Sequence, residues 1–132
     1  METVKIVIEK SVDYYDAYSE NCDGIYCAGE TAEAAKEDVL KGLNLFVNSR
    51  KKEDLPTILQ DEYRVEFQYD VQSFLNYYSE IFNCTALERL TGINQKLLHH
   101  SAAGLKKPRE SQRKKIETSL HRLGNELLAV RL

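Results

Sequence analysis

The segment EYRVEFQYD (Glu62–Asp70) contains the clearest structural signal in this sequence. Its apolar and aromatic residues alternate with charged or polar ones, and a period of two places them on one face of a β-strand. These residues are Tyr63, Val65, Phe67 and Tyr69. We therefore predict a half-buried strand whose apolar face is covered by a helix.

Three β-rich runs separated by turn-forming residues precede this strand, and we expect them to form an antiparallel meander. They are VKIVIEK (Val4–Lys10), YYDAYSE (Tyr14–Glu20) and GIYCAGE (Gly24–Glu30). From Thr31 the apolar spacing changes to three and four, which predicts an amphipathic helix to about Ser49 with Thr31 as its N-cap. The first half is therefore predicted to be a two-layer β-β-β-α-β domain.

Residues 71–132 contain no strand pattern, and four segments have helical character with Gly, Asn or Pro between them. They are Val71–Phe82, Thr85–Gly92, Asn94–Gly104 and Arg109–Leu132. The predicted fold class is α+β, with an acidic domain over residues 1–70 and a helical domain over residues 71–132.

Charge separates the same two halves. Residues 1–70 hold 8 Lys and Arg against 16 Asp and Glu, a net charge of -8, whereas residues 71–132 hold 10 against 5, a net charge of +5. Such asymmetry indicates two modules with different partners, and the basic half is the better candidate for binding a polyanion.

Composition limits the class of protein. The 132 residues are 42% hydrophobic and 30% charged, as in globular proteins, and no apolar run approaches the roughly 18 residues of a membrane span. The first residues, METVKIVIEKS, do not resemble a secretory signal, so we expect a cytoplasmic protein without membrane contact. Cys22, Cys27 and Cys84 have no metal-ligand spacing and are expected to be free thiols.

The segment TALERLTGINQKLLHHSAAG (Thr85–Gly104) predicts two short helices that cross at a turn near Gly92. In a helix-turn-helix the second helix enters the major groove, so we expect it to contact DNA bases. The basic residues after it are expected to contact phosphates. The predicted DNA-binding residues are Asn94, Gln95, Lys96, His99, His100, Lys106, Lys107 and Arg109.

This segment resembles the Cro/repressor-like helix-turn-helix, in which the second helix is followed by a glycine, basic residues and a proline. TGIN (Thr91–Asn94), then Gly104, then KKP (Lys106–Pro108) occur in that order. Glu88 stands where such modules usually have a small alanine, and we expect it to disturb the contact between the helices. A three-helix bundle with basic loops would show similar spacing, so that alternative stays open.

The last predicted helix carries one apolar stripe with spacings of four and three, which is typical of a buried face or a dimer seam. The stripe consists of Ile116, Leu120, Leu123, Leu127 and Val130. We expect a homodimer or a higher homo-oligomer. A metal site at His99 and His100 is not expected, because neighbouring side chains on a helix diverge by about 100°.

The whole chain resembles the HicB antitoxin family in its order of elements and in the phrase NCDGIYCAGETAEAAKEDVLKGLNLFV (Asn21–Val47). The motif residues are Gly24, Gly29, Glu30, Thr31, Ala34 and Ala35. The resemblance implies a partial RNase H-like domain that does not cleave RNA and neutralises a small basic mRNA-cleaving toxin, HicA. It also implies self-association and repression of the protein's own operon.

Two other functions remain open from the sequence. One is an interaction protein whose helical half only dimerises, which Glu88 favours. The other is a metal-dependent nuclease, which would need clustered carboxylates on the strands. Its candidates, Glu9, Asp13, Asp16 and Asp70, are scattered through turns and strand ends. We therefore predict no catalytic residue, no metal and no cofactor.

Overall fold

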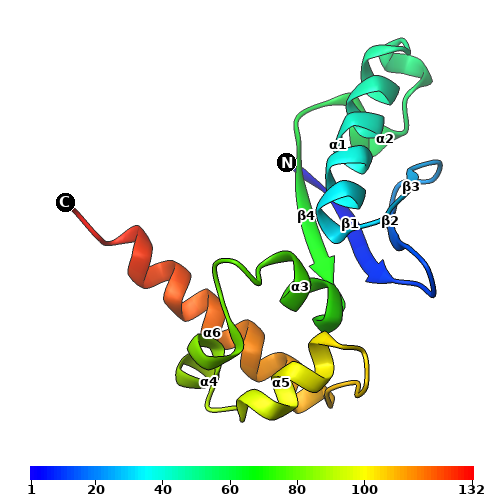
Figure 1. The fold of residues 1–132 in the computed structure, drawn as a ribbon. Coiled ribbons are helices and arrows are strands. Elements are labelled where there is room, and N and C mark those ends of the chain that lie inside the picture. Colours follow the sequence, from blue (N-terminus) through cyan, green and yellow to red (C-terminus); the bar gives the residue numbers. More distant parts are fainter. The chain divides into compact units, whose positions relative to one another are not determined.

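The computed structural model describes all residues, Met1–Leu132, and divides them into two compact units. Unit 1 is Met1–Tyr77 and unit 2 is Tyr78–Leu132. The fold is α+β, with one four-stranded sheet and six α-helices (Figure 1). None of the helices combines the length and the apolar character that a membrane span requires.

The sheet of unit 1 is mixed. Its strands are β1 (Glu2–Lys10), β2 (Tyr15–Ser19), β3 (Tyr26–Gly29) and β4 (Tyr63–Tyr69), in the spatial order β3-β2-β1-β4. The first three form the expected antiparallel meander, and β4 pairs with β1 in parallel. A parallel partner needs a long crossover, which the helical segment between β3 and β4 supplies.

Helix α1 (Ala32–Asn48) packs on one face of this sheet. Its buried residues Ala35, Val39 and Leu43 join Val4 and Ile6 of β1 in the core cluster of the unit. The predicted alternation in β4 is present, since Tyr63 and every second residue after it are half-buried and the others are exposed. The N-cap is also as expected, because the Ala34 N–H donates to Oγ1 of Thr31 over 3.0 Å.

Two short helical turns follow α1, in the segment between the predicted helix and the predicted strand, for which the sequence shows no periodic pattern. They are η1 (Lys52–Asp54) and α2 (Thr57–Gln60). Leu55 and Leu59 join the same core cluster, so this connection covers part of the sheet. Helices this short have too few residues for an apolar period to be recognised.

Helix α3 (Val71–Tyr77) belongs to unit 1, because it contacts α1, β1 and β4. The structure therefore divides the chain after Tyr77, beyond the expected boundary at Asp70. The expected helix to Phe82 is too long, because α3 ends at Tyr77. Asp70 starts α3, since its carboxylate accepts from the Ser73 N–H (2.8 Å) and from the Lys10 N–H (3.0 Å).

Unit 2 consists of α4 (Cys84–Thr91), α5 (Gln95–Ala102) and α6 (Glu110–Leu128), and α4 contacts both of the others. Its buried apolar residues are Leu87, Ile93, Leu98 and Ile116. Three small hydroxyl residues, Thr91, Ser101 and Ser119, are buried with them. The helical prediction for this half is confirmed to within a few residues at each end.

Candidate nucleic-acid interface

The turn between α4 and α5 is closed by backbone geometry that only glycine adopts freely. Gly92 has a φ of 76°, and its N–H donates to the Glu88 carbonyl over 2.7 Å, which ends α4. The buried Thr91 hydroxyl then accepts from the Ile93 N–H over 3.1 Å. These bonds fix the direction in which α5 leaves the turn.

Glu88 holds the two helices together instead of disturbing them. Its Oε2 accepts a hydrogen bond of 2.7 Å from the Gln95 N–H, the first amide of α5. A carboxylate is favourable there because the first amides of a helix lack partners and carry positive charge. The expectation that Glu88 hinders packing is therefore wrong, since the half-buried side chain reaches the helix end rather than the helix contact.

Gln95 and Asn94 are positioned by further hydrogen bonds. The Thr85 hydroxyl donates a hydrogen bond of 3.0 Å to Oε1 of Gln95. The Nε2 amide group of Gln95 then makes no hydrogen bond to α4. Asn94 caps α5, because its Oδ1 accepts from the Lys96 N–H over 2.8 Å. Gln95 is half-buried and Asn94 is exposed.

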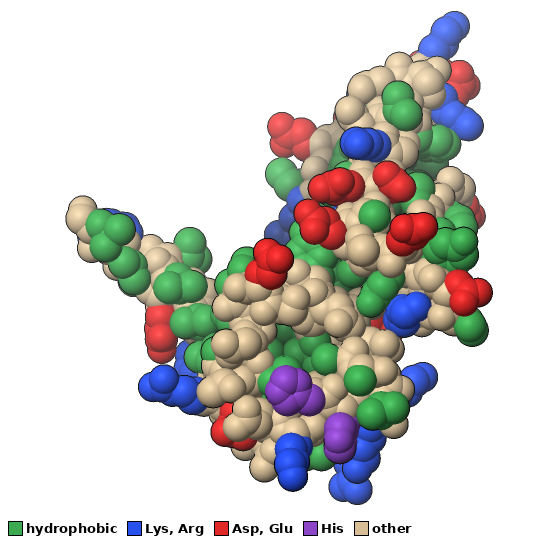
Figure 2. Space-filling model, viewed as in Figure 1, with side chains coloured by type: hydrophobic (Ala, Val, Ile, Leu, Met, Phe, Trp, Pro, Cys, Tyr) green, Lys and Arg blue, Asp and Glu red, His purple; other side chains and the backbone are tan.

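The outer side of α5 is polar and exposed. His99 and His100 follow Lys96 by three and four residues, so each lies next to Lys96 on the helix surface, and all three are exposed. Figure 2 shows two histidine side chains and several Lys or Arg side chains on the part of the surface where Figure 1 draws α5. This side of α5 therefore presents hydrogen-bond donors and positive charge to solvent.

The loop between α5 and α6 adds three exposed cations, Lys106, Lys107 and Arg109. The chain contains three ion pairs, and none involves these residues or Lys96. Gly104, with a φ of 77°, ends α5 and turns the chain into this loop. The cations carry uncompensated charge, which is what contact with a phosphate backbone requires.

A shallow groove beside the turn was not indicated by the sequence. It has a volume of about 430 Å³ and lies between the turn and the start of α6. Its polar lining includes Asn94, Ser111 and Lys115, and a Cβ placed on Gly92 would lie 3.6 Å from the Lys115 Nζ. No sequence pattern links α6 to the turn, so only the fold brings Lys115 to this place.

The apolar stripe of α6 changes its role along the helix. Ile116 is buried in unit 2, and Leu120 and Leu123 are half-buried. Leu127 is 59% exposed, and Val130, which lies beyond the end of α6, is 53% exposed. A dimer seam would therefore use the C-terminal part of the stripe, because Ile116 is already enclosed.

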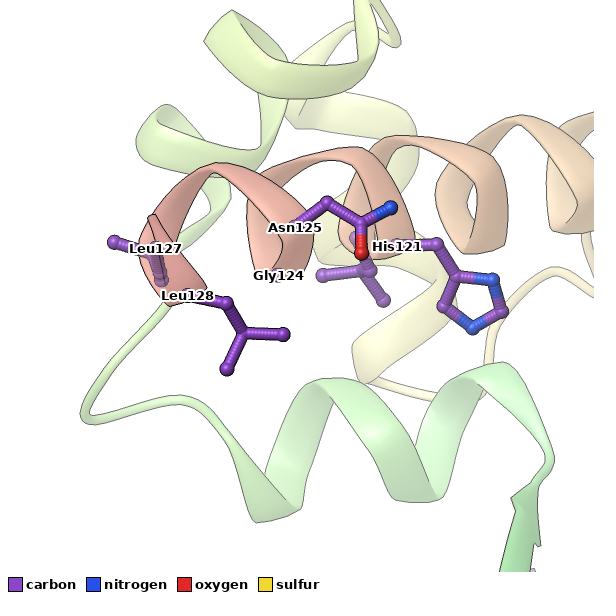
Figure 3. A pocket seen from close by; sticks show the side chains of 6 residues that line it. His121, Gly124, Asn125, Leu127 and Leu128 are labelled. Carbon is purple, nitrogen blue, oxygen red and sulfur yellow. The ribbon is translucent and has the colours of Figure 1, made fainter. Parts of the chain in front are cut away.

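An open hollow of about 740 Å³ lies along the same C-terminal part of α6. Figure 3 shows His121, Asn125 and Leu128, which line it, on one side of the helix. Leu128 is exposed, like Leu127. This end of α6 thus offers apolar surface to a further chain.

Of the four carboxylates considered for a nuclease, Glu9 and Asp16 lie opposite each other on β1 and β2. No group of three or more His, Cys, Asp or Glu residues is arranged to hold a metal ion. Asp70 is engaged in starting α3, and Asp16 accepts a hydrogen bond of 3.0 Å from the Tyr26 hydroxyl.

No family model matches the chain, and neither a curated protein nor a solved structure matches it.

Proposed function

We propose that the protein is a HicB-like antitoxin, which represses its own operon through unit 2 and neutralises a small basic toxin through unit 1. The observation that carries the proposal is the geometry of α4 and α5. A glycine turn and the Glu88 carboxylate hold α5 so that the half-buried Gln95 and the exposed Lys96 and His99 form the start of a polar surface. This arrangement supports a Cro/repressor-type helix-turn-helix.

In the proposed complex, α5 lies in the major groove of operator DNA. Gln95 and Lys96 contact base edges near its N-terminal end, and His99 and His100 lie one turn further along the helix. Lys106, Lys107 and Arg109 contact phosphates and set the position of the module without selecting a sequence. Two copies in a homodimer present their α5 helices about 34 Å apart, one turn of DNA.

Unit 1 is proposed to be a partial RNase H-like domain without catalytic function. The β-β-β-α-β order of β1 to β4 and α1 supports this assignment. Residues 1–77 keep the net charge of -8, because residues 71–77 contain no charged side chain. An acidic surface is suited to a basic protein such as a HicA-like toxin, since complementary charge speeds association and excludes wrong partners.

An interaction protein that does not bind DNA is the second candidate. The exposed Leu127, Leu128 and Val130 favour it, because apolar residues at the end of α6 suit self-association alone. In this case the cations after α5 would be ordinary surface charge.

Titration of a labelled DNA fragment from upstream of the gene distinguishes the two candidates. The experiment uses two salt concentrations and an excess of random DNA as competitor. We expect a complex that survives the competitor and weakens steeply as salt rises, because phosphate contacts release bound counterions. Absence of a complex at low salt would leave self-association as the role of unit 2.

Co-expression with a small basic protein encoded beside the gene tests the role of unit 1. A stable complex and relief of that protein's toxicity are expected. A neighbouring toxin that stays active in the presence of this chain would contradict the antitoxin proposal, whatever the DNA titration shows.

A further inference from the structure

One face of the unit 1 sheet carries no helix of that unit. The helices α1, α2 and α3 all contribute to the core that contains Val4, Ile6 and Ile8 of β1. Because side chains alternate along a strand, the residues between these three point to the other face. We call that other face the open face, and it is defined here by Val7, Glu9, Asp16, Tyr18 and Tyr26.

An aromatic row crosses the open face. In the strand register Val7 of β1 lies opposite Tyr18 of β2, and Tyr18 lies opposite Tyr26 of β3. Val7 is only 7% exposed although it lies outside the core cluster. Tyr18 is half-buried and Tyr26 is 64% exposed, which leaves ring surface available to a partner.

Carboxylates lie on both sides of this row, on a face that also carries Lys5 of β1 and Arg64 of β4. Glu9 lies opposite Asp16 in the next register position, and Glu20 follows β2 directly. None of the three takes part in an ion pair. The pKa of the Tyr18 phenol is raised by burial first and then by Glu9, Glu20 and Asp16, which agrees with a concentration of negative charge there.

The rings on the open face lack the cations that rings elsewhere in unit 1 hold. Lys36 lies over Phe67 (4.5 Å to the ring centroid) and Lys10 lies over Tyr15 (5.1 Å). Tyr18 and Tyr26 have no such partner within the chain. A tyrosine ring beside a carboxylate binds a guanidinium well, because the ring attracts the cation and the carboxylate pairs with it.

We propose that the open face is the docking surface for a basic polypeptide, whose arginine side chains lie over Tyr18 and Tyr26 and pair with Glu9 and Asp16. The inference rests on the part of the proposed function that gives unit 1 a protein partner. It adds the location of the contact and the chemistry of the partner's segment. The methylene stems of the same side chains would cover the exposed ring surface of Tyr18 and Tyr26.

The test uses the full chain and a fluorescein-labelled nona-arginine peptide as probe. Glu9→Gln/Asp16→Asn is compared with Glu33→Gln/Glu37→Gln, which changes the net charge equally at exposed positions of α1. We expect the first pair to weaken peptide binding about tenfold and the second to weaken it less than about twofold. Tyr26→Ala should also weaken binding, whereas Tyr26→Phe keeps the ring and should bind nearly as the parent does.

Amide chemical-shift changes on adding the peptide locate the contact directly, and should concentrate in β1, β2 and β3. Equal losses for the two double variants, or shifts concentrated in α1, would overturn the proposal. So would loss of self-association in the Glu9→Gln/Asp16→Asn protein, since the occupant would then be the basic unit of a second copy. The same variant should bind upstream DNA as tightly as the parent does. A parent protein that does not bind DNA would contradict the role proposed for unit 2, whereas the docking surface is tested by the peptide measurements alone.

Discussion

The two units use their side chains differently. Unit 1 buries a continuous apolar cluster between sheet and helices, including Ile6, Ile8 and Val39. Unit 2 buries few apolar residues and encloses three hydroxyl side chains, of which Thr91 bonds to the Leu87 carbonyl (2.7 Å). Small units bury a smaller share of their surface, so unit 2 is expected to be the less stable one. Its exposed side chains are the ones that DNA binding would use.

The largest expected effect is on the stability of unit 2. Leu98→Ala removes a side chain that is only 2% exposed and should cost about 2–5 kcal/mol of unfolding free energy. Native-state hydrogen exchange should show the loss in α4, α5 and α6, with the amides of unit 1 unchanged. Leu45→Ala, at a position 70% exposed, is the control and should change stability by less than about 0.5 kcal/mol. Equal loss of protection in both units would mean that the chain unfolds as one cooperative body.

The next effect concerns charge in the two units. Lys106→Ala/Lys107→Ala should weaken binding to every DNA sequence, by about tenfold for each lost phosphate contact near 0.1 M salt. The slope of log affinity against log salt should flatten by up to about 2. Lys51→Ala/Lys52→Ala removes an adjacent lysine pair from unit 1 and should leave the slope as it was. If both lysine pairs change the slope equally, Lys106 and Lys107 do not contact phosphates in the way proposed.

A smaller effect should separate base contacts from phosphate contacts within unit 2. Gln95→Ala is expected to cost about 1–3 kcal/mol on the upstream DNA and little on random DNA, because only base contacts select sequence. Thr85→Val removes the hydroxyl that holds the Gln95 amide and should reduce the same discrimination by less. Competition binding measures both. A Gln95→Ala loss that is equal on the two DNAs would remove Gln95 from base recognition.

Glu88 provides a still smaller test of how unit 2 is held together. Glu88→Ala should lower stability by about 0.5–2 kcal/mol, since the first amide of α5 loses its acceptor. Glu88→Gln keeps an oxygen acceptor and should lose less. Urea unfolding followed by circular dichroism gives both values. A Glu88→Ala protein as stable as the parent would show that solvent replaces the carboxylate without cost.

The smallest effect is a titration in unit 1. The pKa of Tyr26 is raised chiefly by its hydrogen bond to Asp16, and that of Tyr18 by burial and then by carboxylates. A raised phenol pKa contributes stability that is present below the unfolded value and is lost as pH rises through the folded value. Because the Glu9→Gln/Asp16→Asn protein lacks two of the carboxylates that raise the pKa of these phenols, its phenolate absorbance should develop at lower pH. An unchanged titration curve would place these carboxylates too far away to act on the rings.

Much of the fold was predictable because it depends on local patterns. The alternation in Glu62–Asp70 and the spacing behind Thr31 specified a strand and a helix that the structure contains. The glycines at 92 and 104 marked helix ends, because both adopt a positive φ that other residues avoid. The short α2 and the early end of α3 were missed, since contacts with the sheet rather than period decide them.

The candidate site was only partly predictable for the same reason. The residues available to the site were already evident in the sequence: the polar start of α5, the cations after it, and the opposite net charges of the two halves. The tertiary structure decided what Glu88, Thr85 and Lys115 do, because their partners lie on other elements. It also decided that Ile116 is enclosed while Leu127 of the same stripe is exposed. A helical period says which residues share a side, but only packing against other elements determines how much of that side is covered.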